Sequence, residues 1–458
     1  MVSLQDALQL ARQASGAVQG ALLDAQAQTL QAQALSGLGG PSLNLTGFAG
    51  RVSNAINLDL SAVAAAGNPL LGMAGAALPS IDLPTIPNAL QVTRISTLGS
   101  VGLGGIWPLY AGGRIAAVQG LAQGRAQEAV AEQASSEQQL ATQVAQRYFT
   151  VQLARAAQAL RADVVLGVMA HQRDALKLEA AGLIARVERL KADLALDNAR
   201  REQAKARSDV ALAEVALQRL LAVPQPPLPS TPLFVNSQGP GPLTDFVQAG
   251  QLHHPAWQKL AAKRAQAAQS LALQGQAGAP NVVALANYNL NHDSAKLLQP
   301  NWQVGVHVSI PLLSRIDHAQ LREAARLQQQ RVDVSAAQAQ RDIPTLIEVQ
   351  WRAVENARAQ YLGGASAIAL AEEGLRLQRI SFAQAQSTST DVSDAQLQLA
   401  KSQTERLQAA HDYVLGLSRL LEACGQPERL IEFAARADII LAIGSPAPGP
   451  TSPGDAPP

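Results

Sequence analysis

The chain has 458 residues, of which only 3% are aromatic, and its 36 Lys and Arg residues balance 35 Asp and Glu. So few aromatic side chains argue against several independent globular cores, and the near-neutral charge excludes a basic surface for nucleic acid. The single cysteine, Cys424, excludes an internal disulfide and a multi-cysteine metal site. A composition rich in Ala, Gln, Leu, Arg and Glu instead favours long helices with short non-helical islands.

The N-terminal residues 1–6 lack the basic and apolar regions of an export signal. We therefore expect either that such a signal is absent from this chain because it was removed or misannotated, or that the protein stays in the cytosol. No run of about 18 apolar residues predicts a membrane-spanning helix. The nearest candidate, residues 61–81, is interrupted by glycines and prolines.

Two copies of one pattern fill most of the chain. Residues 3–7 and 40–43 match residues 242–246 and 279–282 at one offset, 242 − 3 = 239, whereas Pro108 matches Pro311 at an offset of 203. Residues 217–221 match residues 417–421 at an offset of 200. The fall from 239 to 203 predicts a 36-residue insertion in the first copy, between Leu45 and Ile106.

These matches and the Pro-rich stretches divide the chain. We predict a first repeat over 1–224, a Pro-rich linker over 225–242, a second repeat over 243–424, and a short helix with a disordered Pro-rich tail over 425–458. The first repeat holds strands near 41–50 and 92–108, an insertion loop over 51–91, and a helical hairpin over 112–223 with its tip near 182. The second holds strands near 280–290 and 301–311 and a hairpin over 314–423 with its tip near 386.

Residues 301–311 alternate strictly between apolar and polar side chains, as a strand with two different faces does. One face carries Val304, Val306, Val308 and Ile310, and the other carries Gln303, Gly305, His307 and Ser309. Two strands per repeat give four per chain, too few to close a barrel. Either other subunits pair with the sheet edges, or the strands are a minor lid on a helical protein.

The long helices are predicted to pack through a heptad seam, with apolar residues at alternating spacings of three and four. The first seam comprises Ala192, Leu196, Ala199, Ala206, Val210, Ala213, Leu217 and Leu220, and the second comprises Leu407, Ala410, Val414, Leu417 and Leu421. Alanine at so many seam positions lets helix axes approach closely. The segment from Arg114 to Gly182 would span roughly 100 Å as one helix.

Three segments, in this order and spacing, carry a resemblance to a known family. They are residues 107–114 (Trp-Pro-Leu-Tyr-Ala-Gly-Gly-Arg), the hairpin tip at 181–188, and residues 390–395. Together with two copies of helix, strand, strand and long hairpin, they make the chain similar, from Ser3 to about Gly425, to the TolC-like outer-membrane efflux family.

The resemblance implies an α+β membrane protein. It implies a homotrimer whose twelve strands close a β-barrel in the outer membrane, continued by a long α-helical barrel in the periplasm. Implied partners are outer-membrane lipid, a periplasmic adaptor protein and an inner-membrane transporter. The implied function is the passive exit duct of a tripartite efflux pump or type I secretion system, for small molecules such as drugs or for secreted polypeptides. No nucleic acid, no cofactor and no enzymatic activity is expected.

The resemblance also assigns candidate site residues. Asp391 and Asp394 match acidic rings at the pore entrance, although helix-dipole stabilisation alone explains acidic residues at a helix start. Gly182 and Leu183 match an adaptor-contact tip, although any helical hairpin needs a Gly-permissive turn. Gln303, His307 and Ser309 would line the barrel lumen.

Three remaining features have competing interpretations. Residues 51–91, an extracellular loop by resemblance, are unusually apolar and either cap the barrel mouth or form a variable surface loop. His253 and His254 have no acidic or cysteine partner at ligand spacing, so no metal site is predicted. The glycine-rich residues 99–105 are better explained by a transmembrane strand than by a phosphate loop. A soluble periplasmic or cytosolic coiled-coil scaffold without channel activity remains the alternative function.

Overall fold

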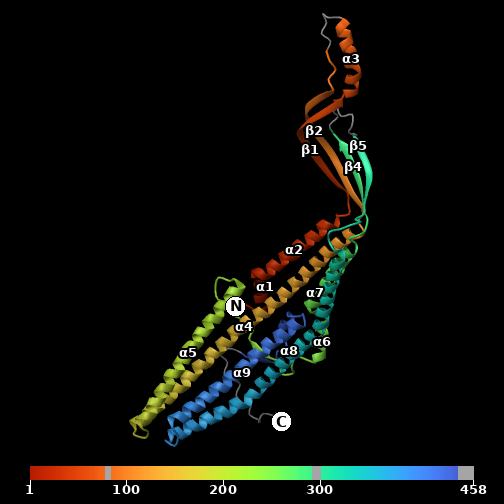
Figure 1. Cartoon of the computed structure of the whole chain (residues 1–458). Helices are drawn as coiled ribbons and strands as arrows, with labels where there is room; N and C mark the ends of the chain where they lie inside the picture. The colour runs from red at the N-terminus through yellow and green to blue at the C-terminus, as the bar shows by residue number, and fades with distance from the viewer. Residues whose placement is uncertain (78–83, 291–300, 442–458) are drawn as a thin grey trace. The chain divides into compact units, whose positions relative to one another are not determined.

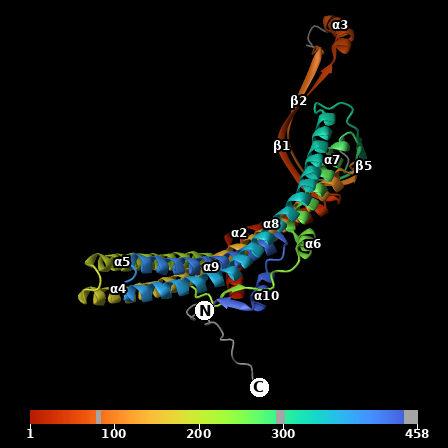
Figure 2. The same ribbon diagram turned by 90° about the horizontal axis from the view of Figure 1, so that it is seen from below.

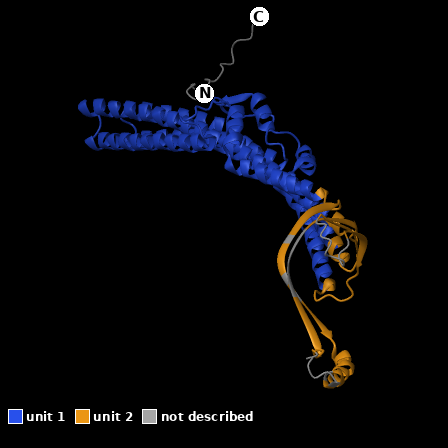
Figure 3. Cartoon of the chain, turned by 90° about the horizontal axis from the view of Figure 1, so that it is seen from above, with its two compact units in different colours: residues 1–35, 118–271, 320–458 blue, residues 36–117, 272–319 orange. Residues whose placement is uncertain are grey.

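The computed structural model describes residues 1–77, 84–290 and 301–441, and the chain divides into two compact units (Figure 3). Unit 1 contains residues 1–35, 118–271 and 320 onward, and unit 2 contains residues 36–117 and 272–319. Each unit therefore draws on both halves of the sequence, so the two repeats are interleaved and do not fold as separate domains.

Unit 2 is built on one antiparallel sheet of four strands in the order β1-β2-β4-β5. Its strands are β1 (Ser42–Asp59), β2 (Ala89–Tyr110), β4 (Asn281–Asn289) and β5 (Trp302–Ser309). Every residue of β5 is exposed, and neither β1 nor β5 has a strand on its outer edge among the described residues. An unpaired edge exposes a row of backbone N–H and C=O groups, so this sheet is incomplete as a single chain.

The predicted loop over residues 51–91 is wrong. The β1–β2 ladder runs without a break from Ser42↔Ile106 to Asp59↔Ala89, and helix α3 (Ser61–Ala77) lies at the end of this hairpin (Figure 1). The insertion lengthens both strands because its alternating sequence is compatible with a strand, and Ala-rich residues then favour a helix. A hydrogen bond from the Ser61 backbone N–H to the Asp59 Oδ1, 2.9 Å long, caps the start of α3.

Unit 1 is helical and contains two long hairpins that lie side by side (Figures 1 and 2). The hairpins are α4 (Arg114–Ala180) with α5 (Arg186–Leu221), and α8 (His318–Ala383) with α9 (Ser389–Ala423). Shorter helices accompany them: α1 (Leu4–Ala14), α2 (Gly16–Ser36), α6 (Leu243–His253), α7 (Pro255–Gly275) and α10 (Arg429–Ala435). No helix among the described residues is long and apolar enough to span a membrane.

The predicted heptad seams are largely confirmed as the packed faces of α5 and α9. In α5 six of the eight predicted residues are buried and the other two, Ala213 and Leu220, are half-buried. All five predicted residues of α9 are buried. Around them a core of aromatic rings forms where the helices meet, with Phe149 and Tyr413 both packed edge-on against Phe234.

The repeat is visible in the element boundaries. Helices α1 and α6 begin at Leu4 and Leu243, and strands β1 and β4 begin at Ser42 and Asn281, at the predicted offset of 239. After the strands, helices α4 and α8 end at residues 180 and 383, an offset of 203. The offset of 200 near the ends of α5 and α9 is wrong, because these helices end at residues 221 and 423, and the left-handed residues that follow them, Ala222 and Gly425, are again 203 apart.

The error has a physical origin in the heptad pattern. Leucines in a heptad seam recur every three or four residues, so two seams can also be aligned with a shift of three residues. Residues 217–221 and 417–421 have similar sequences and align in this way, about one helical turn out of register. At the offset of 203, Leu217 corresponds to Leu420, and both side chains are fully buried.

The linker and the C-terminal segment form a small second sheet. Strand β3 (Leu233–Val235) pairs with β6 (Ile439–Leu441), and all three residues of β3 are buried. The linker is therefore part of the core of unit 1, and residues 439–441, which follow the predicted short helix, form a strand that the sequence analysis missed. Three consecutive aliphatic residues explain this strand. The predicted disordered tail lies within residues 442–458, which are outside the described residues.

Candidate functional site

The aspartates predicted at the pore entrance lie in the first two turns of α9. Asp391 forms a capping box with Thr388: the Thr388 backbone N–H and hydroxyl both donate to Asp391 Oδ2, at 2.7 and 2.8 Å. These hydrogen bonds, first from the backbone N–H and then from the hydroxyl, lower the pKa of Asp391. Asp394, one turn further on, is exposed. Both carboxylates therefore lie at the surface near the tip of the second hairpin.

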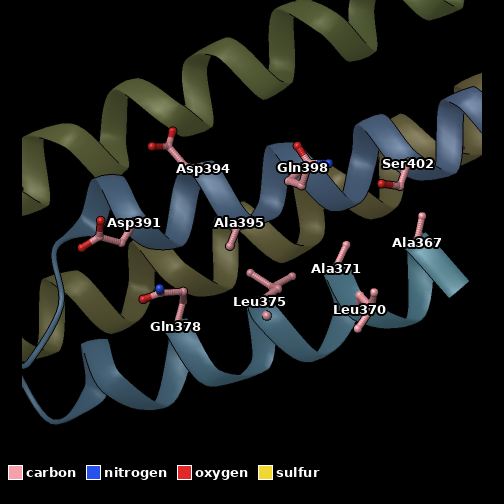
Figure 4. A pocket seen from close by; sticks show the side chains of 11 residues that line it. Ala367, Leu370, Ala371, Leu375, Gln378, Asp391, Asp394, Ala395, Gln398 and Ser402 are labelled. Atoms are coloured by element: carbon pink, nitrogen blue, oxygen red, sulfur yellow. The ribbon is translucent and has the colours of Figure 1, made fainter.

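Asp391 and Asp394 line an open groove of about 720 Å³ between α8 and α9. Figure 4 shows them on α9, across from the α8 side chains of Leu375 and Gln378. Small residues on α8, Ala367, Ala371 and Gly374, leave the groove shallow and wide. The structure thus brings the two predicted acidic residues together at one surface, where a second chain could add further carboxylates.

The first hairpin tip carries the predicted pair Gly182 and Leu183. Gly182 has a φ of +74°, and its N–H donates to the carbonyl of Glu179 while the N–H of Leu183 donates to the carbonyl of Leu178. This is a Schellman motif. The motif requires one residue in the left-handed conformation, which glycine adopts without strain. Leu183 is 59% exposed. Val187, in the first turn of α5, is 52% exposed, so the tip presents more than one apolar side chain to solvent.

The predicted lumen residues lie on one face of the sheet in unit 2. Gln303 of β5 pairs with Asn287 of β4, and the Cβ direction of Gly104 on β2 points at the side-chain oxygen of Asn287, 3.1 Å away. By strand register the same face carries His307 and Ser309. Polar side chains thus lie on this face in β4 and β5, beside Gly104 of β2, and the same register adds the apolar Leu285, Val283 and Ile106.

The opposite face of the sheet is apolar. In β5 it carries Val304, Val306 and Val308, which pair with residues 286, 284 and 282 of β4, and in β1 it carries Leu43 and Leu45. All five of these side chains are exposed. The sheet therefore has one apolar face and one mixed face that carries the polar side chains, and neither face is covered in the single chain.

Exposed aromatic residues mark two levels along this sheet. Tyr288 pairs with Trp302 at one end of β4, and Trp107 pairs with Ala284 and Tyr110 with Val282 toward the other. The distance from Tyr288 to Val282 is six residues, roughly 20 Å along a strand. Apolar bands about 25 Å tall with aromatic girdles are typical of β-barrels in membranes.

Near the hairpin tips a buried polar cluster joins the two hairpins, and the sequence analysis missed it. His171 of α4 is only 6% exposed, and its Nε2 lies 2.7 Å from the Ser389 hydroxyl at the start of α9. Its ring packs edge-on against Phe382 of α8. The backbone N–H of Ser389 donates to Glu188 of α5, at 2.7 Å. Four helices are therefore held together at this point.

Burial and hydrogen bonding together set the ionisation of this cluster. Burial, and secondly the positive charge of Arg379, lower the pKa of His171 below its ordinary value. Burial would raise the pKa of Glu188, but hydrogen bonds from Lys191 and Ser389 outweigh it and lower that pKa. A neutral histidine beside an ionised glutamate is thus the state favoured near neutral pH. The sequence signal for this cluster is a histidine at a position where the heptad pattern calls for an apolar residue.

The remaining polar candidates have structural roles. Cys424 is buried, which raises the pKa of its thiol to about 12 and makes it unreactive. His254 accepts a hydrogen bond from the Ala256 N–H at the start of α7, 3.1 Å long. Among the described residues, no three His, Cys, Asp or Glu side chains gather as a metal site would require.

Comparisons with known proteins give one family and one fold. Residues 7–223 match the profile of a family described as outer membrane efflux protein. No curated protein sequence matches the chain. Similar solved structures include the CusC transmembrane channel, with a TM-score of 0.74 and 17% identity over 92% of each chain.

Two further channels are equally similar in structure. For the open state of the Neisseria gonorrhoeae MtrE outer membrane channel the TM-score is 0.73 and the identity 18%, over 93% of this chain and 89% of that one. For the Campylobacter jejuni CmeC outer membrane channel the TM-score is 0.74 and the identity 12%, over 94% and 89%. These identities are low, so the likeness establishes the fold: the predicted α+β fold of long helical hairpins and short strands is confirmed.

Proposed function

We propose that this chain, which belongs to the outer membrane efflux protein family, is one of three identical subunits of a passive duct through the outer membrane. In this proposal twelve strands, four from each subunit, close a β-barrel in outer-membrane lipid. The helical hairpins form a tunnel in the periplasm, which a periplasmic adaptor protein connects to an inner-membrane transporter. That transporter supplies the energy, because the family is one of channels and not of enzymes.

The observation that carries the proposal is the uncovered sheet of unit 2. A sheet with one apolar face and one face that carries polar side chains, neither of them covered, is unstable in water as a single chain. Closure into a barrel places the apolar face against lipid and the polar face around water, and it pairs the free edges of β1 and β5 with each other across subunits. Strand β4 has nine residues and β5 has eight, close to the length of about 9–11 residues that a tilted membrane-spanning strand needs.

The entrance and the tip complete the proposal. Three copies of the α8–α9 groove would place six carboxylates, two per chain from Asp391 and Asp394, around the periplasmic opening, where they favour cations. Exposed Leu183 would contact the adaptor. Leu183→Glu should then reduce efflux in cells without changing conductance in lipid bilayers, whereas Gln386→Glu, at the equivalent position of the second tip, should leave both unchanged. Equal losses for both variants would reject a specific role for Leu183.

The transported molecule belongs to the same proposal. The three similar structures are described as channels, and we expect this duct to pass small molecules such as drugs, or secreted polypeptides, as the inner-membrane partner dictates. A chain carrying an export signal should restore drug resistance to cells that lack their own outer-membrane duct. Absence of any such restoration, with the protein correctly located, would exclude drug efflux with that partner.

A matched pair of substitutions in β5 tests the duct itself. Val306 and His307 are neighbours on opposite faces, so a lysine at one meets lipid and at the other meets water. Val306→Lys should cost about 2–4 kcal/mol of membrane stability and prevent trimer formation. His307→Lys should preserve the trimer and shift the channel toward anions. The measurements are outer-membrane fractionation, mass in detergent, and reversal potential in lipid bilayers.

The outcomes separate the candidate functions. A detergent-stable trimer that conducts, with opposite effects of the two lysines, supports the duct. A soluble monomer or dimer after successful export, indifferent to both lysines, supports the coiled-coil scaffold instead.

A further inference from the structure

The hairpin of β1 and β2 extends far beyond the rest of its sheet. The last pair of β2 with β4 is Gly102↔Asn289, and Thr46 of β1 lies opposite Gly102. From there β1 continues to Asp59, 59 − 46 = 13 residues, paired only with β2. This extension, residues 47–59 with residues 89–101, is roughly 44 Å long. An isolated two-stranded ribbon is marginally stable at best in water, so the extension requires a partner.

The apolar side of the hairpin changes face in the extension. In the four-stranded part, Leu43 and Leu45 lie on the face that carries the valines of β5. Toward the far end of the extension the apolar pairs Ile56↔Val92 and Leu58↔Leu90 lie on the other face, whereas Val101 at its base stays on the face of Leu43. The ladder has no bulge, so the face is fixed by whether the residue number is odd or even. The apolar side of the extension thus continues the lumen face of the sheet.

In the extension, polar side chains occupy the face that would meet the membrane in the four-stranded part of the sheet. Arg51, Asn57 and Asp59 of β1 lie on the face that continues Leu43 and Leu45, and Gln91 of β2 pairs with Asn57 there. All four are exposed. A surface with Arg and Asp is poorly suited to the lipid interior. The extension therefore lies outside the membrane, with its polar side toward water and its apolar side in continuity with the lumen.

Helix α3 adds a second apolar surface at the end of the extension. It has no charged residue, and Val63, Leu70 and Met73 are 55%, 67% and 73% exposed. Their spacings of seven and three place them in one stripe, as in a heptad seam. The opposite side of the helix is held by its own chain: Asn68 exchanges two hydrogen bonds with the backbone of Ile86, at 2.7 and 3.0 Å.

We propose that three copies of this hairpin pack against one another above the barrel and form an apolar collar. The collar consists of the apolar pairs of the extension and the α3 stripe from each of three subunits. The inference rests on the proposed trimer, because a closed barrel brings three copies of the same hairpin to one end around one axis. The lumen-continuous face is then the one that meets the other copies, which explains why the apolar side changes face.

A lipid surface is the alternative occupant and fits the residues less well. Helices that lie in a membrane interface carry a charged face opposite their apolar one, rich in Lys and Arg, and α3 has neither residue. Lipid would also require the apolar side of the extension to continue the face of Leu43, and it does not.

Cysteine cross-linking tests the collar directly. Met73→Cys, oxidised in the purified trimer, should give disulfide-linked dimers containing up to about two thirds of the chains, the limit for one disulfide per trimer. Ala65→Cys is the matched control: it is exposed on the same helix but off the stripe, and should cross-link at least fivefold less. The unaltered chain, whose Cys424 is buried, should not cross-link.

Conductance gives an independent readout. Replacing residues 60–88 by a two-residue Asn-Gly turn should at least double the single-channel conductance, and oxidised Met73→Cys should conduct less than the same protein reduced. A conducting trimer in which Met73→Cys and Ala65→Cys cross-link equally, or neither does, overturns the collar alone. So does protection of Met73→Cys from aqueous maleimide by lipid without cross-linking. Absence of a conducting trimer overturns the proposed function itself.

Discussion

The two hairpin tips differ at the left-handed residue of the turn: the first tip has Gly182 there and the second has Ala385. Gly182 and Ala385 are 203 residues apart, both have positive φ, and both sit in the same pattern of hydrogen bonds, with Gln386 donating to Ser381 in the second tip. A left-handed backbone suits glycine, whereas the Cβ of alanine is strained there by roughly 1 kcal/mol. The second tip therefore holds its turn against a small conformational strain.

Ala385→Gly should relieve that strain. We expect a net stabilisation of roughly 0.5–1 kcal/mol, measured as a higher temperature of thermal unfolding in detergent. Gly182→Ala should have the opposite sign at the first tip. As a control, Ala383→Gly in the last turn of α8 should destabilise, because glycine is a poor helix former. A lower unfolding temperature for Ala385→Gly would show that the turn differs from the one described.

His171 makes the contact between hairpins sensitive to acid. Because its pKa in the folded chain lies below the ordinary histidine value of 6.5, the unfolded segment takes up a proton first as the pH falls. The contribution is therefore fully present above pH 6.5 and is lost as the pH falls from 6.5 toward the folded pKa. Hydrogen exchange at the start of α9, corrected for its intrinsic pH dependence, should rise between pH 7.5 and 5.

Two variants isolate this effect. His171→Gln should remove the pH dependence of exchange at Ser389, whereas His253→Gln, an exposed position on α6, should retain it. A slope that persists in His171→Gln would assign the acid sensitivity to other groups, such as Glu188 or Asp174 nearby.

At the scale of the element, the start of α9 combines two separable tasks. Thr388 and Asp391 cap the helix, whereas Asp394 is exposed one turn further on. Thr388→Ala should cost about 1 kcal/mol of local stability, seen as faster hydrogen exchange in the first turn, and leave cation preference unchanged. Asp394→Asn should do the reverse, reducing cation preference in bilayers. An equal loss of selectivity in both variants would mean that the cap itself shapes the entrance.

The elements also show which parts of the fold the sequence could predict. The seam of α9 and the strand alternation of β5 were predictable because their periods are local and repeat many times. Helix α3 was missed because Gly67 and Pro69 interrupt it, and because most of its apolar residues are alanines spread around the whole helix. Gly67 in fact allows contact with Ile86, since a Cβ at that position would lie 2.6 Å from the Ile86 side chain.

The site was less predictable than the fold. Asp391, Asp394 and Gly182 could be chosen because acidic and glycine residues stand out and the family resemblance, now confirmed, gave them a role. Their functional assignments stay predictions. Ala385 gave no signal, because alanine rarely adopts a positive φ. The contact of His171 with Ser389 joins residues 218 positions apart, which no local pattern reveals.

At the scale of the whole molecule, the linker between the repeats is held in place by hydrogen bonds, and we expect the protein to tolerate a break in its backbone there. The N-terminal Val2 is hydrogen bonded to the backbone of Leu228 and Ser230, and Gln152 donates to Pro229, so the chain beyond the linker is held by the first repeat. Pro226 between the repeats is exposed. The contacts between repeats are made by a shared core and not by the covalent connection.

Two fragments, residues 1–225 and 226–458, each with an export signal, should therefore assemble when produced together. We expect them to copurify from the outer membrane in equal amounts and to conduct like the intact protein. A break inside α4, between residues 160 and 161, is the control and should abolish assembly because it opens a continuous helix. Failure of the linker-cut pair alone would indicate that the connection guides folding.

The insertion between β1 and β2 changes the offset between the repeats only once, from 239 before it to 203 after it. Its base is narrow: the Leu60 N–H donates to the carbonyl of Asn88, 3.0 Å away, where the chain leaves and rejoins the hairpin. Any folded domain whose termini lie equally close could be grafted at this point without moving a neighbouring residue. The end of the hairpin is thus an insertion site, at which a reporter domain or an epitope can be displayed while the rest of the protein keeps its fold.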